Sequence, residues 1–351
     1  MKKFYFLIAS FLLIFLAGIN GCVKIKKGPP DGGVFKSENK GDSWVQKTFL
    51  VPVMGTKGGN IANLNVKEIV VDPQDPKTLY LASEGGMFIS YNRGETWWQV
   101  ISLPNLRIES IAIDPKSHCF IYATLQNKIY KSTDCGRSWE NTYLDARANV
   151  LVNKIVVDFY NNAILYAGLS TGDLLKSTDF GQSWFVIKRF ENNLKEILLD
   201  PNDSRILYIA TQRKGLFKSV DSGTNWIDLN QGLKEFSGAF EFKALAYDKT
   251  RKNTLILASR YGLLKTEDGG QNWRALNLLT PPRSTEIYSL VINPQNGQEI
   301  FYSTANLIYK TENGGLNWQT LKIPTSRTPV SLRIDPQNPN LLFMGVRAIK
   351  K

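Results

Sequence analysis

The chain has 351 residues and is basic, with 43 Lys and Arg against 31 Asp and Glu and a formal net charge of +12. One large domain accounts for this length, because all-β domains exceed the usual domain size without splitting and no linker interrupts the chain. The single histidine, His118, has no metal-ligand spacing around it, and no glycine-rich phosphate loop is present. The sequence therefore favours neither a metal enzyme nor a nucleotide-dependent one, and we expect no metal and no cofactor.

The first residues predict export. Lys2 and Lys3 precede an apolar run over residues 4–16, which is shorter than the roughly 20 residues that a membrane-spanning helix needs. We expect an exported protein that faces the periplasm or the cell exterior.

The sequence Ile-Asn-Gly-Cys at residues 19–22 resembles a bacterial lipobox. The resemblance implies that residues 1–21 are a lipoprotein signal peptide and that Cys22 carries the lipid that anchors the chain in a bilayer. Because Asn20 departs from the motif, an uncleaved or differently cleaved anchor, with Cys22 an ordinary residue, stays open. Residues 22–32, rich in Lys, Gly and Pro, are predicted to be a flexible tether, and residues 33–351 the folded domain.

A phrase of eight residues recurs seven times in that domain: a hydroxyl residue, any residue, Asp or Asn, any residue, Gly, two more residues and Trp. Successive phrase tryptophans are 42 to 53 residues apart, which matches the roughly 40–50 residues of a four-stranded propeller blade. The sequence therefore predicts an all-β fold, a single seven-bladed β-propeller. The repeated positions are Ser37, Asn39, Gly41, Trp44; Ser90, Asn92, Gly94, Trp97; Ser132, Asp134, Gly136, Trp139; Ser177, Asp179, Gly181, Trp184; Ser219, Asp221, Gly223, Trp226; Thr266, Asp268, Gly270, Trp273; and Thr311, Asn313, Gly315, Trp318.

The composition of the phrase is that of a hairpin turn between the third and fourth strands of a blade. Its hydroxyl and its Asp or Asn oxygen can accept backbone N–H groups, and its Gly supplies the positive φ of a tight turn. Its Trp can be buried over the turn. We interpret these residues as structural, since catalytic groups are not required in seven equivalent copies.

Seven apolar runs, each closed by Asp-Pro or an equivalent turn, alternate with the phrases and predict the innermost strand of each blade. A second strand follows each run. The first phrase lacks these two strands before it, and the last pair, near residues 329–346, lacks a phrase after it. We therefore expect the strand near Leu341–Val346 to pair with the strand near Gly33–Lys36, which closes the ring and removes its exposed edges.

Cys119 and Cys135 are predicted to lie side by side, because the first opens the second strand of a blade and the second lies in the phrase turn of the same blade. A disulfide suits an exported protein. Two free thiols remain the alternative.

Function is expected on the face opposite the phrase turns, which carries the longer loops at residues 50–65, 141–151, 230–241 and 276–285. The inner strands enter the central channel from this face with polar residues, namely Lys67, Glu68, Glu109, Lys154, Lys195, Glu196, Lys243 and Tyr288. Three further cations, Arg213, Arg260 and Arg347, follow second strands at near-equivalent positions. We expect these arginines and the four lysines to bind an acidic protein surface, although a solvated surface of a basic protein explains them too.

The seven phrases resemble Asp-box (BNR) repeats, and the resemblance covers nearly the whole domain. Such repeats occur in sialidases, xyloglucan-cleaving hydrolases, sortilin-type receptors and the photosystem II stability/assembly factor family. A single seven-bladed ring behind a lipobox is most similar to the last of these. This resemblance implies a non-enzymatic assembly factor on a membrane that binds protein partners through a basic face.

The rival hypothesis is a glycoside hydrolase or a carbohydrate-binding propeller. The early Arg-Ile-Pro signature of sialidases is missing, yet Glu84, Asp145, Asp173 and Glu286 could pair as the two carboxylates that hydrolysis needs. Nucleic-acid binding is not expected, because the aromatic residues belong to the repeats and do not alternate with Lys and Arg as stacking platforms. We expect a monomeric, lipid-anchored binding or assembly scaffold for a membrane or envelope protein.

Overall fold

The computed structural model describes residues 30–53 and 58–349, and Asp31–Lys351 forms one compact unit. The predicted signal peptide, Cys22 and most of the predicted tether lie outside the described residues. Across the described ranges, no helix is both long and apolar enough to cross a membrane.

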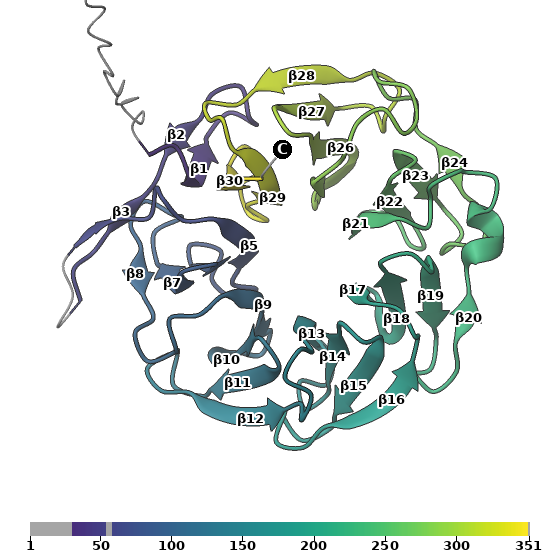
Figure 1. The fold of residues 1–351 in the computed structure, drawn as a ribbon. Helices are drawn as coiled ribbons and strands as arrows, with labels where there is room; N and C mark the ends of the chain where they lie inside the picture. The colour runs from purple at the N-terminus through teal and green to yellow at the C-terminus, as the bar shows by residue number, and fades with distance from the viewer. Residues whose placement is uncertain (1–29, 54–57, 350–351) are drawn as a thin grey trace, which may run out of the picture. The chain divides into compact units, whose positions relative to one another are not determined.

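Seven four-stranded antiparallel sheets form a ring of blades around a central axis (Figure 1). The prediction of a seven-bladed β-propeller is confirmed. The blades, from inner to outer strand, are β5 (Val66–Val71), β6 (Leu79–Ser83), β7 (Gly86–Ser90), β8 (Trp98–Gln99); β9 (Ile108–Asp114), β10 (Ser117–Leu125), β11 (Lys128–Ser132), β12 (Glu140–Leu144); β13 (Val152–Val157), β14 (Leu165–Leu169), β15 (Asp173–Ser177), β16 (Phe185–Arg189); β17 (Leu194–Asp200), β18 (Asp203–Thr211), β19 (Leu216–Ser219), β20 (Ile227–Asp228); β21 (Phe242–Tyr247), β22 (Leu255–Ser259), β23 (Leu263–Thr266), β24 (Arg274–Ala275); β25 (Ser289–Asn293), β26 (Asn296–Ser303), β27 (Leu307–Thr311), β28 (Gln319–Lys322); and β29 (Thr328–Ile334), β30 (Leu342–Arg347), β1 (Gly33–Ser37), β2 (Val45–Gln46).

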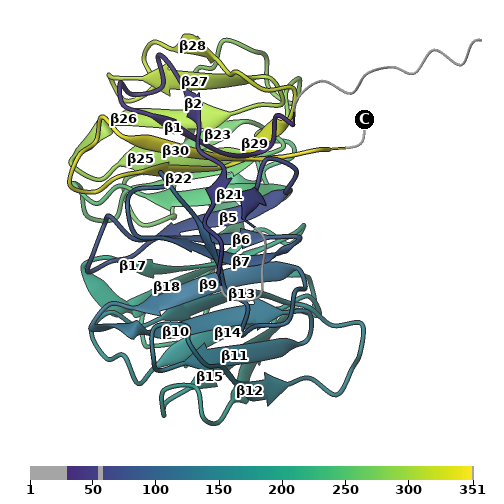
Figure 2. The same ribbon diagram turned by 90° about the vertical axis from the view of Figure 1, so that its left-hand side faces the viewer.

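The two ends of the folded unit close the ring within one blade. Strand β1 pairs antiparallel with β30, from Gly33 opposite Val346 to Ser37 opposite Leu342, and Figure 2 shows the two strands side by side. Val34 of β1 and Phe343 of β30 are fully buried in a cluster shared with the β5–β8 blade. The predicted closure is confirmed, and each blade is covered on both faces by its neighbours.

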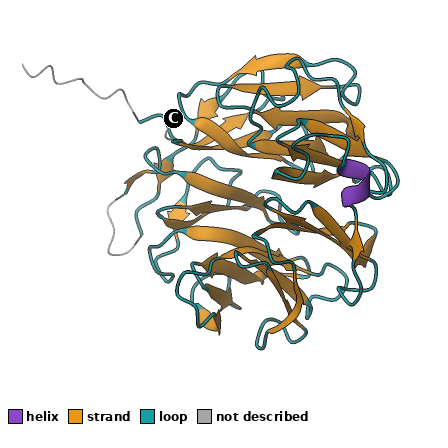
Figure 3. Ribbon diagram, turned by 45° about the vertical axis from the view of Figure 1, so that its right-hand side comes forward, coloured by secondary structure: helices purple, strands orange, loops and turns teal. Residues whose placement is uncertain are grey.

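Two small elements lie outside the blades. Strands β3 (Phe49–Leu50) and β4 (Gly59–Asn60) form a two-stranded hairpin, and the 3₁₀ helix η1 (Asn230–Leu233) follows β20, on the rim of the ring (Figure 3). The chain next to β3 packs along Trp97, whose indole N–H donates to the Lys47 carbonyl at 2.9 Å. Trp97 is therefore fully buried.

The repeated phrase forms the turn that its composition predicts. In the fourth copy, the Ser177 hydroxyl donates to Asp179 at 2.8 Å and accepts the Gly181 N–H at 2.8 Å. Asp179 also accepts the Ser183 N–H at 2.9 Å, and the Trp184 indole donates to the Gly181 carbonyl at 3.0 Å. Side-chain and backbone groups of the phrase thus satisfy each other's hydrogen bonds within its eight residues.

The turn needs two consecutive left-handed residues, which the composition did not reveal. Phe180 has φ of 58° and Gly181 has φ of 79°, as in the tight hairpin turns whose twist matches that of the strands. The residue before the phrase Gly has positive φ in all seven copies: Lys40, Arg93, Cys135, Phe180, Ser222, Gly269 and Gly314. The residue type at this position varies between the copies, so the sequence gives no sign of the backbone conformation. A positive φ costs a residue other than Gly about 1–2 kcal/mol, and this cost is tolerated once the blade is packed.

Ring closure generates the first prediction. Deleting residues 329–351 removes β29 and β30 and exposes β1 together with the faces of two blades. We expect aggregation or rapid proteolysis, measured by limited proteolysis and thermal melting against a control that lacks only residues 350–351. A truncated chain with the melting temperature of the control would contradict this closure.

The phrase aspartates generate the second prediction. The hydroxyl and backbone N–H of Ser183 lower the pKa of Asp179 to about 2 from a usual value of 3.8. A depressed pKa contributes stability above pH 3.8 that is lost as the pH falls through about 2. Asp179→Asn should therefore flatten the fall in melting temperature between about pH 4 and pH 2, and Asn92→Asp, in an equivalent turn, should steepen it. Identical pH profiles of variants and wild type would contradict this assignment.

Candidate functional site: the central channel

The innermost strands of the seven blades line a central cavity of about 1000 Å³. Each strand starts on the face formed by the loops between blades, here called the upper face, and ends at the Asp-Pro turns of the lower face. All the polar residues that the sequence places on the channel line this cavity: Lys67, Glu68, Glu109, Lys154, Lys195, Glu196, Lys243 and Tyr288. Lys67 and Glu68 are neighbours in sequence, as are Lys195 and Glu196, and both members of each pair line the cavity because the strand pairing shifts register there, between Val66 and Glu68 and between Leu194 and Glu196.

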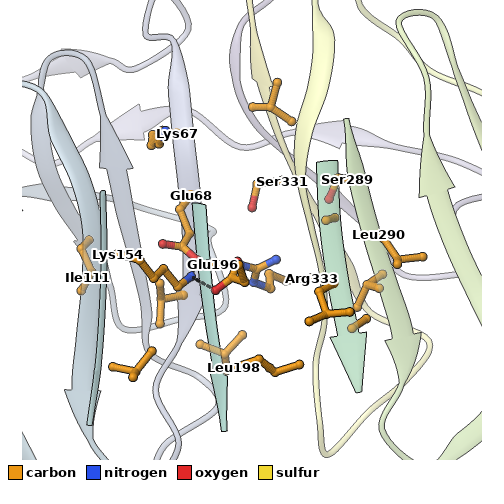
Figure 4. Close-up of a pocket in the computed structure, with 18 of the residues that line it drawn as sticks. Lys67, Glu68, Ile111, Lys154, Glu196, Leu198, Ser289, Leu290, Ser331 and Arg333 are labelled. Atoms are coloured by element: carbon orange, nitrogen blue, oxygen red, sulfur yellow. Dashed lines mark hydrogen bonds and ion pairs between the residues drawn. The ribbon is translucent and has the colours of Figure 1, made fainter. Parts of the chain in front are cut away.

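A network of four charged side chains crosses the middle of the channel (Figure 4). Lys154 Nζ lies 3.1 Å from Glu68 Oε1 and 3.2 Å from Glu196 Oε1, and Arg333 Nη2 lies 2.9 Å from Glu68 Oε1. The four residues come from four strands, β13, β5, β17 and β29. Two cations and two carboxylates offset one another, so this layer has no net charge.

Burial and charge set the protonation states in this network. Burial opposes the charge on Lys154, but the Glu196 and Glu68 carboxylates raise its pKa. Burial alone would raise the pKa of Glu68, but Lys154 and Arg333 hold it below its usual value. At Glu196 burial prevails and raises the pKa in spite of Lys154. Lys154 is thus the cation that both carboxylates share.

Lys67, Glu109 and Lys195 line the cavity one layer nearer the upper face. Arg107, in the loop before β9, contacts Glu109 from outside the lining, and these four residues are here called the channel mouth. The Glu109 carboxylate forms an ion pair with Arg107 at 2.8 Å and a longer one with Lys67 at 3.4 Å. Lys195 forms no ion pair within the described residues, and its pKa is lowered by burial and by the Lys67 charge. Three cations therefore face one carboxylate, and the mouth carries an excess of two positive charges.

Two serines also line the channel, on β25 and β29. Serine hydroxyls there accept the unpaired N–H groups of the next blade: Ser289 accepts from Leu332 at 2.9 Å, and Ser331 accepts from Ile69 at 3.0 Å. Both serines are labelled in Figure 4. These serines thus connect the inner strands of neighbouring blades around the channel.

The three arginines singled out in the sequence do not gather at this site. Arg347 lines the channel, where it pairs with Glu84 at 3.1 Å. Arg213 and Arg260 lie in the loops after β18 and β22 and are not part of the channel wall. Sequence reasoning missed Arg107 and Arg333. A charged residue inside the apolar run before Asp335 was the available signal for Arg333.

The four carboxylates considered for hydrolysis are each held by a cation. Asp145 and Asp173 lie close together, because the carboxylates of both form ion pairs with the Arg147 guanidinium at 2.8 Å. Hydrogen bonds from Arg147 lower the pKa of Asp145 to about 2. In addition, Glu84 pairs with Arg347, and Glu286 pairs with Lys243. A general acid needs a pKa near the working pH, so this arrangement does not favour Asp145 in that role.

The shared lysine generates the third prediction. Lys154→Met leaves Glu196 in the channel without its ion-pair partner, and we expect a loss of about 1–3 kcal/mol in the free energy of unfolding, because both side chains keep partial contact with solvent. In the double variant Lys154→Met/Glu196→Gln the loss should be smaller, with a coupling of about 0.5–3 kcal/mol. Urea unfolding measures both, with the exposed Lys322→Met as control. Strictly additive losses would show that the two side chains do not interact.

The comparisons with known proteins agree with this architecture. The family model described as Photosynthesis system II assembly factor YCF48 matches residues 91–240. No curated protein matches the sequence. The structure of YCF48 bound to D1 peptide has a TM-score of 0.62 at 15% identity over 81% of this chain and 93% of that one. For YCF48 from Cyanidioschyzon merolae the TM-score is 0.61 at 12% identity, over 80% of this chain and 95% of that one.

A GH74 xyloglucanase from Xanthomonas campestris has a TM-score of 0.67 at 16% identity, over 81% of this chain. This chain spans only 51% of that hydrolase. At such identities the structural likeness establishes the fold alone. The repeated phrases, the closed ring and the matched family model together confirm that the chain is a seven-bladed propeller of the Asp-box type that resembles the photosystem II assembly factor YCF48.

Proposed function

We propose that this protein is an exported, lipid-anchored and non-enzymatic scaffold that binds an acidic segment of a protein partner at the channel mouth. The observation that carries the proposal is the excess of positive charge there: Lys67, Arg107 and Lys195 face the single carboxylate of Glu109. A carboxylate-bearing peptide that enters from the upper face would supply the missing negative charge. Burial of Lys195 strengthens the interaction, because charges attract more strongly where water is partly excluded.

Two further observations support a binding role. A protein of the same fold and nearly the same length, YCF48, is bound to a D1 peptide in its structure. In addition, the carboxylates considered for hydrolysis are paired with Arg147, Arg347 or Lys243. A membrane or envelope protein with an acidic surface segment is the partner that this charge arrangement suits, and we expect one propeller to bind it as a monomer.

The channel mouth generates the fourth prediction. Lys67→Glu/Lys195→Glu should weaken binding of a fluorescently labelled acidic peptide with a free C-terminus by about tenfold or more, because the variant replaces attraction with repulsion. Fluorescence anisotropy measures the affinity, and added salt should weaken it. The matched control is Lys188→Glu/Lys322→Glu, which makes the same change at two exposed residues of outer strands.

The arginines outside the channel provide the comparison that locates the site. If Arg213→Glu/Arg260→Glu abolishes binding and Lys67→Glu/Lys195→Glu does not, the peptide binds the outer loops and the channel mouth is not the site. Equal affinity for the corresponding Gln peptide would contradict charge recognition. Hydrolysis of a polysaccharide or sialoside, lost on removal of an upper-face carboxylate, would establish the glycosidase alternative instead.

Membrane attachment generates the fifth prediction, which falls on residues outside those that the structure describes. Mass spectrometry of the mature protein should find the chain beginning at a lipidated Cys22, because the lipobox directs modification and cleavage there. Cys22→Ser should release the protein from the membrane fraction. A mature chain that begins elsewhere, or unchanged membrane association of Cys22→Ser, would refute the lipid anchor.

A further inference from the structure

A second cluster of chemically reactive side chains lies on the lower face, away from the channel mouth. Cys119 lies near the start of β10, and Cys135 lies in the phrase turn between β11 and β12 of the same blade. The Cys135 N–H donates to the Cys119 carbonyl at 3.2 Å, and the two residues form a disulfide. The turn geometry thus holds the two sulfur atoms together.

The only histidine of the chain completes this cluster. His118 directly precedes Cys119, and its backbone N–H donates to the Gln74 side chain of the neighbouring blade at 3.0 Å. One ligand atom each from His118, Cys119 and Cys135 lies within 4.8 Å of the other two. His118 is exposed and the two cysteines are half-buried, so an ion can reach the cluster from solvent.

Two thiolates and one imidazole are a donor set that suits Zn²⁺. Four-coordinate zinc with Zn–S distances of about 2.3 Å needs its sulfur ligands about 3.7 Å apart. Bonded sulfurs are about 2.0 Å apart and have no thiolate charge to donate. The same pair can therefore hold a metal ion or form a disulfide, but never both at once.

The turn does not depend on the disulfide. Six other phrases adopt the same turn with Lys40, Arg93, Phe180, Ser222, Gly269 or Gly314 in place of Cys135. In this copy the Ser132 hydroxyl still donates to Asp134 at 2.8 Å, and Asp134 still accepts the Ser138 N–H at 2.9 Å. Strands β10 and β11 are paired from Ile121 opposite Ser132 to Leu125 opposite Lys128. The cysteines can thus separate by the small distance that zinc requires while the blade stays folded.

We propose that Cys119, Cys135 and His118 form a Zn²⁺ site in the reduced protein, for which the disulfide is the closed, metal-free form. Reduction by a dithiol breaks the S–S bond, takes up two electrons and two protons, and forms two thiols, while the dithiol becomes a disulfide. Binding of Zn²⁺ then releases the two thiol protons and places both thiolates and the imidazole on the ion. The fourth coordination position faces solvent beside the exposed His118 and is filled by water.

The experiment uses the full-length chain with Cys22→Ser, so that Cys119 and Cys135 are the only thiols. The protein is reduced with a dithiol, freed of the reductant without oxygen, and titrated with Zn²⁺ against a chromophoric chelator. We expect one Zn²⁺ per reduced chain and none for the oxidised chain. Titration with Co²⁺ should give the near-ultraviolet charge-transfer absorption that reports thiolate ligation.

Two controls separate a built site from incidental binding. His118→Ala changes one exposed side chain and should weaken Zn²⁺ binding at least about tenfold, since even the loss of a residue that only orients a ligand costs about 10–100-fold. Carbamidomethylation of the reduced thiols keeps the sequence and should abolish binding. Circular dichroism checks that each sample is folded.

The proposal is overturned if the reduced and the alkylated proteins bind Zn²⁺ equally. It is also overturned if His118→Ala binds Zn²⁺ as tightly as its parent, or if the reduced protein shows no thiolate absorption with Co²⁺. In each of these cases the pair is a structural disulfide without a metal-bound state. Peptide binding at the channel mouth is independent of this outcome.

Discussion

Each blade of this protein has two apolar faces, and the ring is stable because every face is covered by a neighbouring blade. A linear row of seven blades would leave one face bare at each end, together with unpaired strand edges. Pairing of β1 with β30 leaves neither strand edge unpaired. It also buries the bare faces, since Val34 and Phe343 then join the cluster of the β5–β8 blade. The remaining features of the molecule depend on this closure.

Closure also creates the channel. It brings seven parallel-running inner strands around one axis, so that residues far apart in the chain face each other at the same level. Arg333 meets Glu68 across 265 positions of sequence, and Lys154 lies between Glu68 and Glu196. The middle layer is balanced in charge, with two cations and two carboxylates. The mouth above it is not balanced, and our proposal of a binding role for the mouth rests on this difference.

The two faces of the propeller are chemically distinct because they are built from different connections. The lower face consists of turns that the repeat prescribes, and Cys135 at a variable position of one phrase lies there beside Cys119 and His118. The upper face consists of loops that vary in length and sequence, and its chemistry comes from cations such as Lys67 and Lys195. Partner binding and metal chemistry would thus use opposite faces without competing.

The sequence by itself determined the fold, the closing strand pair and most of the polar lining of the channel, although Arg333 was missed. These follow from local rules: the phrase composition encodes a turn, and polar residues at the start of the inner strands, such as Lys67 and Lys154, mark the channel face. Which charges pair across the channel was decided by the tertiary structure, because blade curvature and side-chain reach determine whether a cation such as Lys195 meets a carboxylate. The same holds for Arg213 and Arg260, which occupy repeat positions similar to that of Arg347 yet lie off the channel wall. The sequence placed Cys119 beside Cys135 and His118 next to Cys119, but only the folded blade shows that ligand atoms of all three residues lie within 4.8 Å of one another.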